Sequence, residues 1–219
     1  MSPTRLVLLS DTHGLHDRLR VPDGDVLVHA GDFTKRGREA EVAAFGAWLG
    51  EQPHAHKVVV AGNHDFLFER EPARARELLE GAIYLEHELA VLGDLRLFGS
   101  PWQPWFFDWA FNLRRGPELA AKWREVPSGV DVLVTHTPPM GVLDRTARGE
   151  QVGCADLAAE LPRIAPKVHV FGHIHEARGT VATATGIAVN ACNCNLRYEA
   201  VHAPIVVDIT AGGAEVVST

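Results

Sequence analysis

The sequence is poor in cysteine, with three residues, Cys154, Cys192 and Cys194, among 219. An odd number of thiols and no secretion signal before the first apolar run favour reduced cysteines and a cytoplasmic location. Cys192 and Cys194 form a CxC pair, for which metal binding is conceivable. Because no second pair completes a tetrahedral site, we interpret them as small side chains in a turn.

Long apolar runs and an excess of positive charge are also missing. No apolar stretch has the length of a membrane span, so we expect no membrane partner. The formal net charge is −7, and a field of that sign repels a long polyanion, which argues against extended nucleic acid as a partner. A small phosphate ester stays compatible with this charge because bound cations reverse it locally.

What is present suffices for one substantial folded domain. The hydrophobic content is 46% and the mean hydropathy is −0.03, values typical of a globular protein. We find no internal repeat, low-complexity tract or long linker. We therefore expect a single domain over residues 1–219.

Strand and helix patterns alternate in the first half, and hairpin patterns dominate the second. The expected strands are 5–9, 25–29, 57–60, 130–134, 167–171, 204–209 and 214–217, with short strands in 83–98 and a hairpin over 178–189. The expected helices are 38–49, 71–79, 118–124 and 155–161. Near-continuous apolar runs such as 57–60 are typical of strands buried on both faces. The pattern predicts an α/β fold, a four-layer α/β/β/α sandwich with two mixed β-sheets.

Five short blocks of metal-binding side chains follow five of these apolar runs. They are SDTHG at 10–14, AGD at 30–32, GNHD at 62–65, THT at 135–137 and GHIH at 172–175. Ligands of such folds bind at the carboxyl ends of strands, and these oxygen and nitrogen donors suit a two-metal hydrolytic site. Asp11 and His13 are two residues apart, as are His173 and His175, so on an extended chain each pair points the same way.

In order, the blocks resemble the DxH, GD, GNH[DE], H and GHxH motifs of the calcineurin-like metallophosphoesterases. Agreement at roughly ten fixed positions leaves little room for chance. The resemblance implies two divalent ions (Mn, Fe, Zn, Co or Ni) and His64 as a proton donor. The implied ligands are Asp11, His13, Asp32 and His175 for one ion, and Asp32, Asn63, His136 and His173 for the other.

Further segments, including GSPWQP at 99–104 and WAFN at 109–112, resemble a subgroup, the metallophosphoesterase-domain proteins, which are similar to class III cyclic-nucleotide phosphodiesterases. This resemblance implies hydrolysis of small phosphodiesters, with cyclic nucleotides among the candidates, by a hydroxide that two metal ions activate. The alternatives are a phosphomonoesterase or nuclease on the same site, or a weakly active or non-catalytic scaffold. The complete ligand set argues against the scaffold.

The sequence departs from the phosphoprotein phosphatases, a branch that carries GDxxDRG. Lys35 stands where that branch has its second Asp, which leaves His64 without its usual carboxylate partner, and Asp65 cannot be assumed to replace it. This argues against a phosphoprotein phosphatase. Arg36 is a candidate clamp for a substrate phosphate, and equally a solvated loop cation.

An aromatic segment, 101–111, holds three of the five tryptophans. We expect most of its rings to pin an irregular loop and, of the group, Trp102 or Trp105 to face the substrate. Seven histidines match no motif position, and we interpret them as hydrogen-bonded or surface residues. They are His16, His29, His54, His56, His87, His169 and His202.

Overall fold

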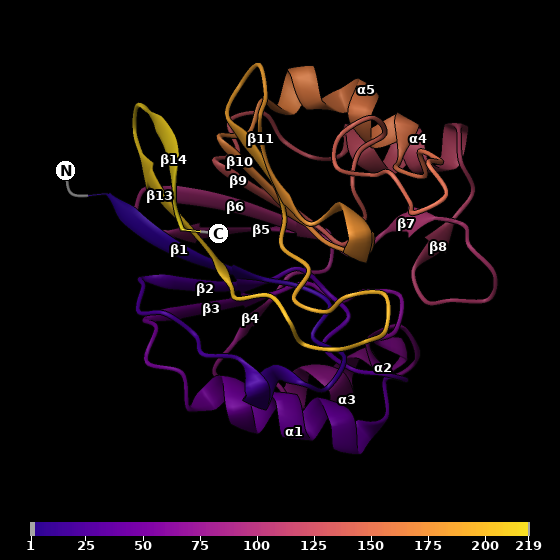
Figure 1. The fold of residues 1–219 in the computed structure, drawn as a ribbon. Coiled ribbons are helices and arrows are strands. Elements are labelled where there is room, and N and C mark those ends of the chain that lie inside the picture. Colours follow the sequence, from indigo (N-terminus) through magenta and orange to yellow (C-terminus); the bar gives the residue numbers. More distant parts are fainter. Residues whose placement is uncertain (1–2, 219) are drawn as a thin grey trace.

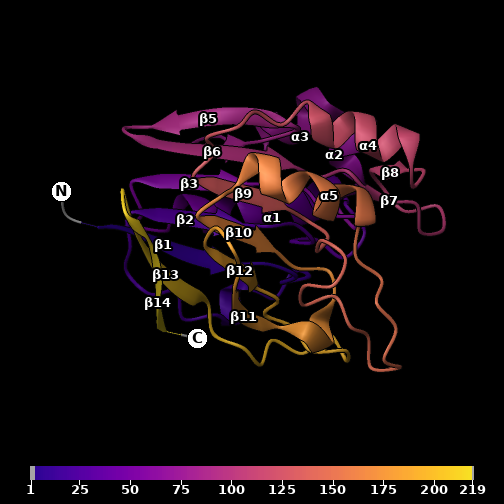
Figure 2. The same ribbon diagram turned by 90° about the horizontal axis from the view of Figure 1, so that it is seen from above.

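Two six-stranded sheets packed face to face form the centre of the molecule in the computed structural model, which describes residues 3–218 (Figures 1 and 2). The first sheet has the order β14 (Gly213–Ser218), β13 (Ile205–Thr210), β1 (Thr4–Leu9), β2 (Val26–His29), β3 (His56–Val59) and β4 (Ile83–Tyr84). Strands β1 to β4 are parallel, and β13 and β14 add an antiparallel edge.

The second sheet has the same character. Its order is β11 (Gly179–Ala182), β12 (Ile187–Asn190), β10 (Val168–Phe171), β9 (Val132–Thr135), β6 (Leu95–Ser100) and β5 (Glu88–Leu92). The four inner strands are parallel and the two edge strands antiparallel. A separate two-stranded ribbon joins β7 (Gln103–Pro104) to β8 (Asn112–Leu113). Both sheets are therefore mixed, as predicted.

Helices cover the outer face of each sheet (Figure 1). The first sheet carries α1 (Glu39–Gly50), α2 (Phe66–Arg70) and α3 (Pro72–Glu77), and the second carries α4 (Pro117–Arg124) and α5 (Ala155–Ile164). Three apolar cores result, one between the sheets and one under each helical layer. The predicted α/β/β/α sandwich is confirmed.

Local signals explain most helix boundaries. Proline occupies the first turn of α3 and of α4, where its missing N–H leaves no bond unmade. Helix α1 buries Val42, Phe45 and Leu49 on one face, which is the predicted spacing. The sequence missed α2, and α5 runs three residues beyond the predicted end, past Pro162. No helix within residues 3–218 is long and apolar enough to cross a membrane.

Candidate metal centre

The carboxyl ends of β1, β2, β3, β9 and β10 meet at one edge of the sandwich, and the five blocks follow them. The two sheets are joined there by hydrogen bonds. The His136 ring, after β9, donates through Nδ1 to the Ala30 carbonyl after β2, at 2.9 Å. The amide of His173, after β10, donates to Asp11 Oδ2, after β1, at 2.9 Å. The blocks therefore form one site, as the sequence predicted.

Four of the predicted ligands have a left-handed backbone. Their φ angles are 54° at Asp11, 44° at His13, 56° at Asp32 and 67° at His173. This conformation is strained for a residue with a Cβ, by about 1–3 kcal/mol each, and such outliers cluster at functional sites. The expectation that strand alternation aims the paired ligands was wrong, because the chain leaves the extended conformation before it reaches them, and tight turns aim them instead.

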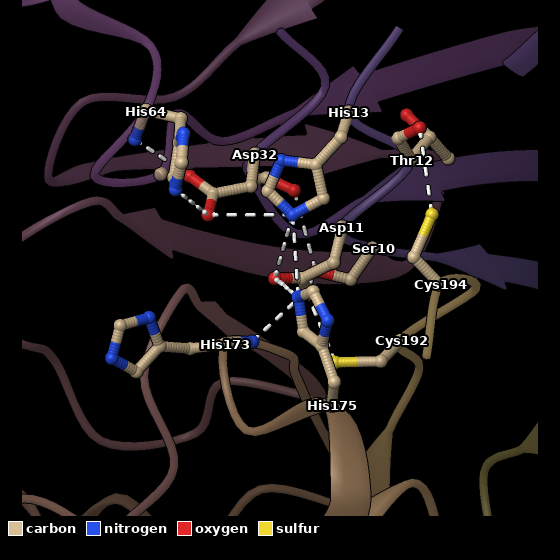
Figure 3. Close-up of polar contacts among 12 residues, drawn as sticks. Ser10, Asp11, Thr12, His13, Asp32, His64, His173, His175, Cys192 and Cys194 are labelled. Carbon is tan, nitrogen blue, oxygen red and sulfur yellow. Dashed lines mark hydrogen bonds and ion pairs between the residues drawn. The ribbon is translucent and has the colours of Figure 1, made fainter. Parts of the chain in front are cut away.

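Backbone carbonyls fix the orientation of the inward-facing imidazoles. His175 Nδ1 donates to the Asn195 carbonyl at 3.0 Å, as His136 Nδ1 does to the Ala30 carbonyl. A carbonyl only accepts, so Nδ1 carries the proton in each ring and Nε2 is the atom that faces the centre. His13 Nε2 lies 3.2 Å from His175 Nε2 (Figure 3). Donors held in this way are typical of metal-binding histidines.

Each carboxylate is held by one oxygen and presents the other. Asp11 Oδ2 accepts from Ser10 Oγ at 2.6 Å, while its Oδ1 lies 3.2 Å from His175 Nε2. Asp32 Oδ1 accepts the His64 amide at 2.8 Å, and its Oδ2 lies 3.4 Å from His136 Nε2 and 3.9 Å from His13 Nε2. Asp32 thus lies between the two predicted ligand sets, the place required of a shared ligand.

Glycine is needed beside both carboxylates. A Cβ on Gly172 would lie 2.0 Å from Asp11 Oδ2, and one on Gly62 would lie 2.2 Å from Asp32 Oδ1. Neither carboxylate can move away without losing its hydrogen bonds. The glycines of the GNHD and GHIH blocks therefore make room for the ligands of the neighbouring blocks.

The pKa shifts of the buried carboxyl and imidazole groups favour the presence of positive charge at the site. Burial works against ionisation of Asp11, but the hydrogen bond and charge of His175 hold its pKa well below the usual range. Burial lowers the pKa of His136 and of His175, yet the neighbouring Asp32 and Asp11 raise each to about 9. Without a cation, these two imidazoles carry the protons that balance the carboxylates.

The predicted ligands fit two divalent cations. Within residues 3–218, His, Asp and Cys donors come within 4.8 Å of one another in three groups, and Asp32 belongs to two of them. The groups are Asp11 with His175 and Cys192, Asp32 with His13 and His64, and Asp32 with His136 and His173. Asn63 Oδ1 lies 3.0 Å from His136 Nε2. Oxygen and imidazole donors of this kind suit borderline divalent metals.

His64 has a partner that the sequence did not reveal. Its Nδ1 donates to the main-chain carbonyl of Lys35 at 2.7 Å, and its Nε2 lies 3.9 Å from Asp32 Oδ2. Lys35 is the residue that replaces the aspartate of the phosphoprotein phosphatases. Its carbonyl orients the ring that the missing carboxylate would have oriented.

Asp65 organises the loops and does not contact the His64 ring. Its carboxylate accepts the amides of Asp32 and Gly62, each at 2.8 Å, and the amide and hydroxyl of Thr34 at 3.0 and 2.7 Å. The loop after β2 is thereby tied to the loop after β3. Asp65 holds Asp32 and His64 in register with one another.

Of the residues predicted to contact the substrate, one lines a cavity at the site and two do not. Arg36 lines a cavity beside His64. Trp102 packs edge-on against Phe111, with ring centroids 5.7 Å apart, and Trp105 is 59% exposed; neither lines that cavity. Trp109 lines the cavity instead, and its ring centroid lies 4.3 Å from that of His64. Nothing in the spacing of the three tryptophans distinguished Trp109 from the other two.

Two further residues near the site were not expected from the sequence. Cys192 Sγ donates to Asp11 Oδ2 at 3.1 Å (Figure 3), and the Tyr198 ring lies edge-on to His13 with centroids 4.7 Å apart. A position near the site could have been inferred for Cys192, because it comes just after a strand, β12, that lies parallel to β10. Treating the CxC pair as an ordinary turn overlooked this position.

Comparison with known proteins shows the family of this chain. The family model described as calcineurin-like phosphoesterase matches residues 4–177. The human metallophosphoesterase domain-containing protein 1 is 43% identical over 94% of this chain and 71% of its own length; a UPF0046 protein of Caenorhabditis elegans is 39% identical over 94% of this chain and 80% of its own. The crystal structure of TT1561 from Thermus thermophilus aligns over 99% of both chains, with a TM-score of 0.63 and 14% identity, and shares the fold. The chain belongs to the calcineurin-like phosphoesterases.

Proposed function

We propose that this phosphoesterase hydrolyses small phosphodiesters with the help of two divalent ions. The observation that carries the proposal is the convergence of oxygen and nitrogen donors on Asp32, with two imidazoles anchored by backbone carbonyls. Such anchoring fixes each ring before an ion arrives, so little ordering remains for binding to supply. Cyclic nucleotides are among the candidate substrates.

The ions would share Asp32. The first would take Asp11, His13, Asp32 and His175, and the second Asp32, Asn63, His136 and His173. When bound, such ions supply Lewis-acid activation of water and of the phosphoryl group. The chain's own contribution is to hold the carboxylates and rings in place, because Ser10, the His64 amide and the Asn195 carbonyl each secure one of them.

His64 is the proton donor in this proposal. The Lys35 carbonyl holds its Nδ1 proton and directs Nε2 toward Asp32. A proton on Nε2 can then pass to the leaving oxygen of the ester as its bond to phosphorus breaks. Arg36 lies on the wall of the adjoining cavity and in this proposal binds a phosphoryl oxygen.

The test is metal-dependent turnover. Protein treated with a chelator should not hydrolyse bis-p-nitrophenyl phosphate, and Mn²⁺ should restore the activity. Parallel assays with monoesters, cyclic nucleotides and a short single strand would rank the substrate classes, and a preference for monoesters would replace the diester assignment. If no phosphoester is hydrolysed with any of Mn²⁺, Zn²⁺, Co²⁺, Ni²⁺ or Fe²⁺, the protein is a non-catalytic scaffold and the proposal fails.

A further inference from the structure

The cavity beside His64 carries more positive charge than one reacting phosphate requires. It has a volume of about 1040 Å³, and its lining includes the cations Lys35, Arg36, Arg38 and Arg70. Resting on the proposed function, we propose that the substrate is a nucleotide-like ester with a second phosphate group besides the one that is cleaved, and that Arg38 and Arg70 recognise this second phosphate.

The four cations have no acidic partner of their own in the part of the chain that the structure describes. Within residues 3–218, none of their side chains forms an ion pair. Glu41, close to two of them in the sequence, uses one carboxylate oxygen to accept the backbone amides of Arg36 and Arg38, at 3.2 and 3.0 Å. In a chain of net charge −7, unpaired cations gathered on one cavity favour a strongly anionic ligand.

The loop that carries three of these cations is held in place. The Thr34 hydroxyl donates to Asp65 and accepts the Gly37 amide at 2.9 Å. Gly37 has a φ of 61°, and a Cβ there would lie 2.2 Å from the amide nitrogen of Phe66, so the loop presses against the start of α2. Because the backbone is fixed, only the side chains need to be ordered when a phosphate binds.

An aromatic wall connects His64 to Arg70. The Trp109 ring lies beside His64, the Phe66 ring stacks on Trp109 with centroids 5.8 Å apart, and the Arg70 guanidinium lies 4.6 Å from the centre of the Phe66 ring. Tyr198 and Phe107 complete the aromatic lining. A flat group stacks well on such a wall.

These groups give the cavity three kinds of contact. A phosphoester would lie next to His64, a flat ring attached to the same scaffold would stack against Trp109, and a second phosphate would reach Arg70 and Arg38. The cavity contains one acidic side chain, Asp108, which leaves the balance positive. Water attacks the first phosphorus, its bond to the leaving oxygen breaks, and that oxygen receives a proton; the second phosphate stays intact.

Binding tests this without relying on turnover. Calorimetry on the Mn²⁺-loaded protein would compare thymidine 3′,5′-bisphosphate with thymidine 5′-monophosphate. We expect the bisphosphate to bind about tenfold more tightly, the effect of one added charge-assisted contact. Arg38→Gln and Arg70→Gln should each reduce that ratio. The matched control, Arg148→Gln, changes an exposed arginine outside the cavity lining and should leave the ratio unchanged.

Turnover then separates this inference from the proposed function. The p-nitrophenyl ester of thymidine 5′-phosphate should have a lower KM when it also carries a 3′-phosphate. A 5′-phosphorylated thymidylyl dinucleotide tests whether a short strand supplies the second phosphate. A binding preference without hydrolysis of any ester would refute the proposed function alone. Hydrolysis of bis-p-nitrophenyl phosphate with equal affinity for mono- and bisphosphate, or a ratio unaffected by both arginine changes, would overturn the inference.

Discussion

The metal centre and the cavity beside it hold their side chains in opposite ways. In the centre, Asp11, Asp32 and His136 are buried, and each is fixed by a hydrogen bond to a defined partner. In the cavity, Arg38 and Arg70 are exposed cations whose side chains form no ion pair within residues 3–218. The reaction centre is preorganised to a single geometry, whereas the cavity can adapt to its ligand.

The largest effect should come from the residue that joins the two ligand sets. Asp32→Asn removes the shared negative charge, so we expect both ions to bind more weakly and turnover of bis-p-nitrophenyl phosphate to fall by more than about 100-fold, beyond the range found for supporting residues. Elemental analysis after gel filtration measures the ions. Two tightly retained ions in this variant would refute the sharing, and Asp94→Asn, in the exposed β5–β6 turn, is the control.

Removing the proton donor should have a smaller effect on p-nitrophenyl esters, and one that depends on the leaving group. His64→Ala should slow esters with poor leaving groups by about 10²–10⁴-fold, because an alkoxide needs a proton as it leaves. Esters of p-nitrophenol should lose far less, since that phenolate leaves unprotonated. The comparison is of kcat for alkyl and p-nitrophenyl esters, and equal losses on both would remove the proton-donor role.

The next prediction concerns Asp65, which holds the loops of the metal centre together. Asp65→Asn replaces an acceptor of four hydrogen bonds by an amide with one accepting oxygen, so Asp32 and His64 should shift relative to one another. We expect turnover to fall by about 10–100-fold and the free energy of unfolding to fall by about 1–3 kcal/mol. Kinetics and urea denaturation measure these; full activity would show that Asp65 is not needed to position the centre.

The smallest expected effect distinguishes two tryptophans of one loop. Trp109→Ala removes the ring beside His64 and should raise KM for a nucleotide ester about tenfold, the value of roughly one stacking contact. Trp105→Ala alters a ring that is 59% exposed and outside the cavity lining and should change KM less than about twofold, as is usual for exposed positions. The reverse order of effects would assign substrate contact to Trp105.

The buried centre was more predictable from the sequence than the cavity. Each ligand block follows an apolar run, and parallel strands bring their carboxyl ends to one edge, so position in the chain indicated position in space. The backbone conformation that directs the ligand side chains was not predictable. Left-handed φ angles occur at Asp11, His13, Asp32 and His173. They arise from long-range contacts between loops, such as the hydrogen bond from the His173 amide to Asp11.

Contacts made by the main chain leave no mark in the sequence. The carbonyl of Lys35 orients His64, yet any residue type at position 35 supplies a carbonyl. Trp102, Trp105 and Trp109 belong to one aromatic segment, and only the path of the β7–β8 loop, held by the bond from the Ala110 amide to the Asn63 carbonyl, brings Trp109 to the cavity. The fold and the convergence of the five blocks therefore follow from pattern, while the lining of the cavity depends on loop geometry.

A calorimetric titration of metal-free protein with Mn²⁺ at about pH 7.5, in buffers of different ionisation enthalpy, tests the central claim most directly. The pKa of His136 and of His175 is raised to about 9, so both rings are protonated at this pH, and metal ligation requires them neutral. The account predicts two ions per chain and the release of at least two protons in total. Binding of a single ion, or of two ions without proton release, would contradict it.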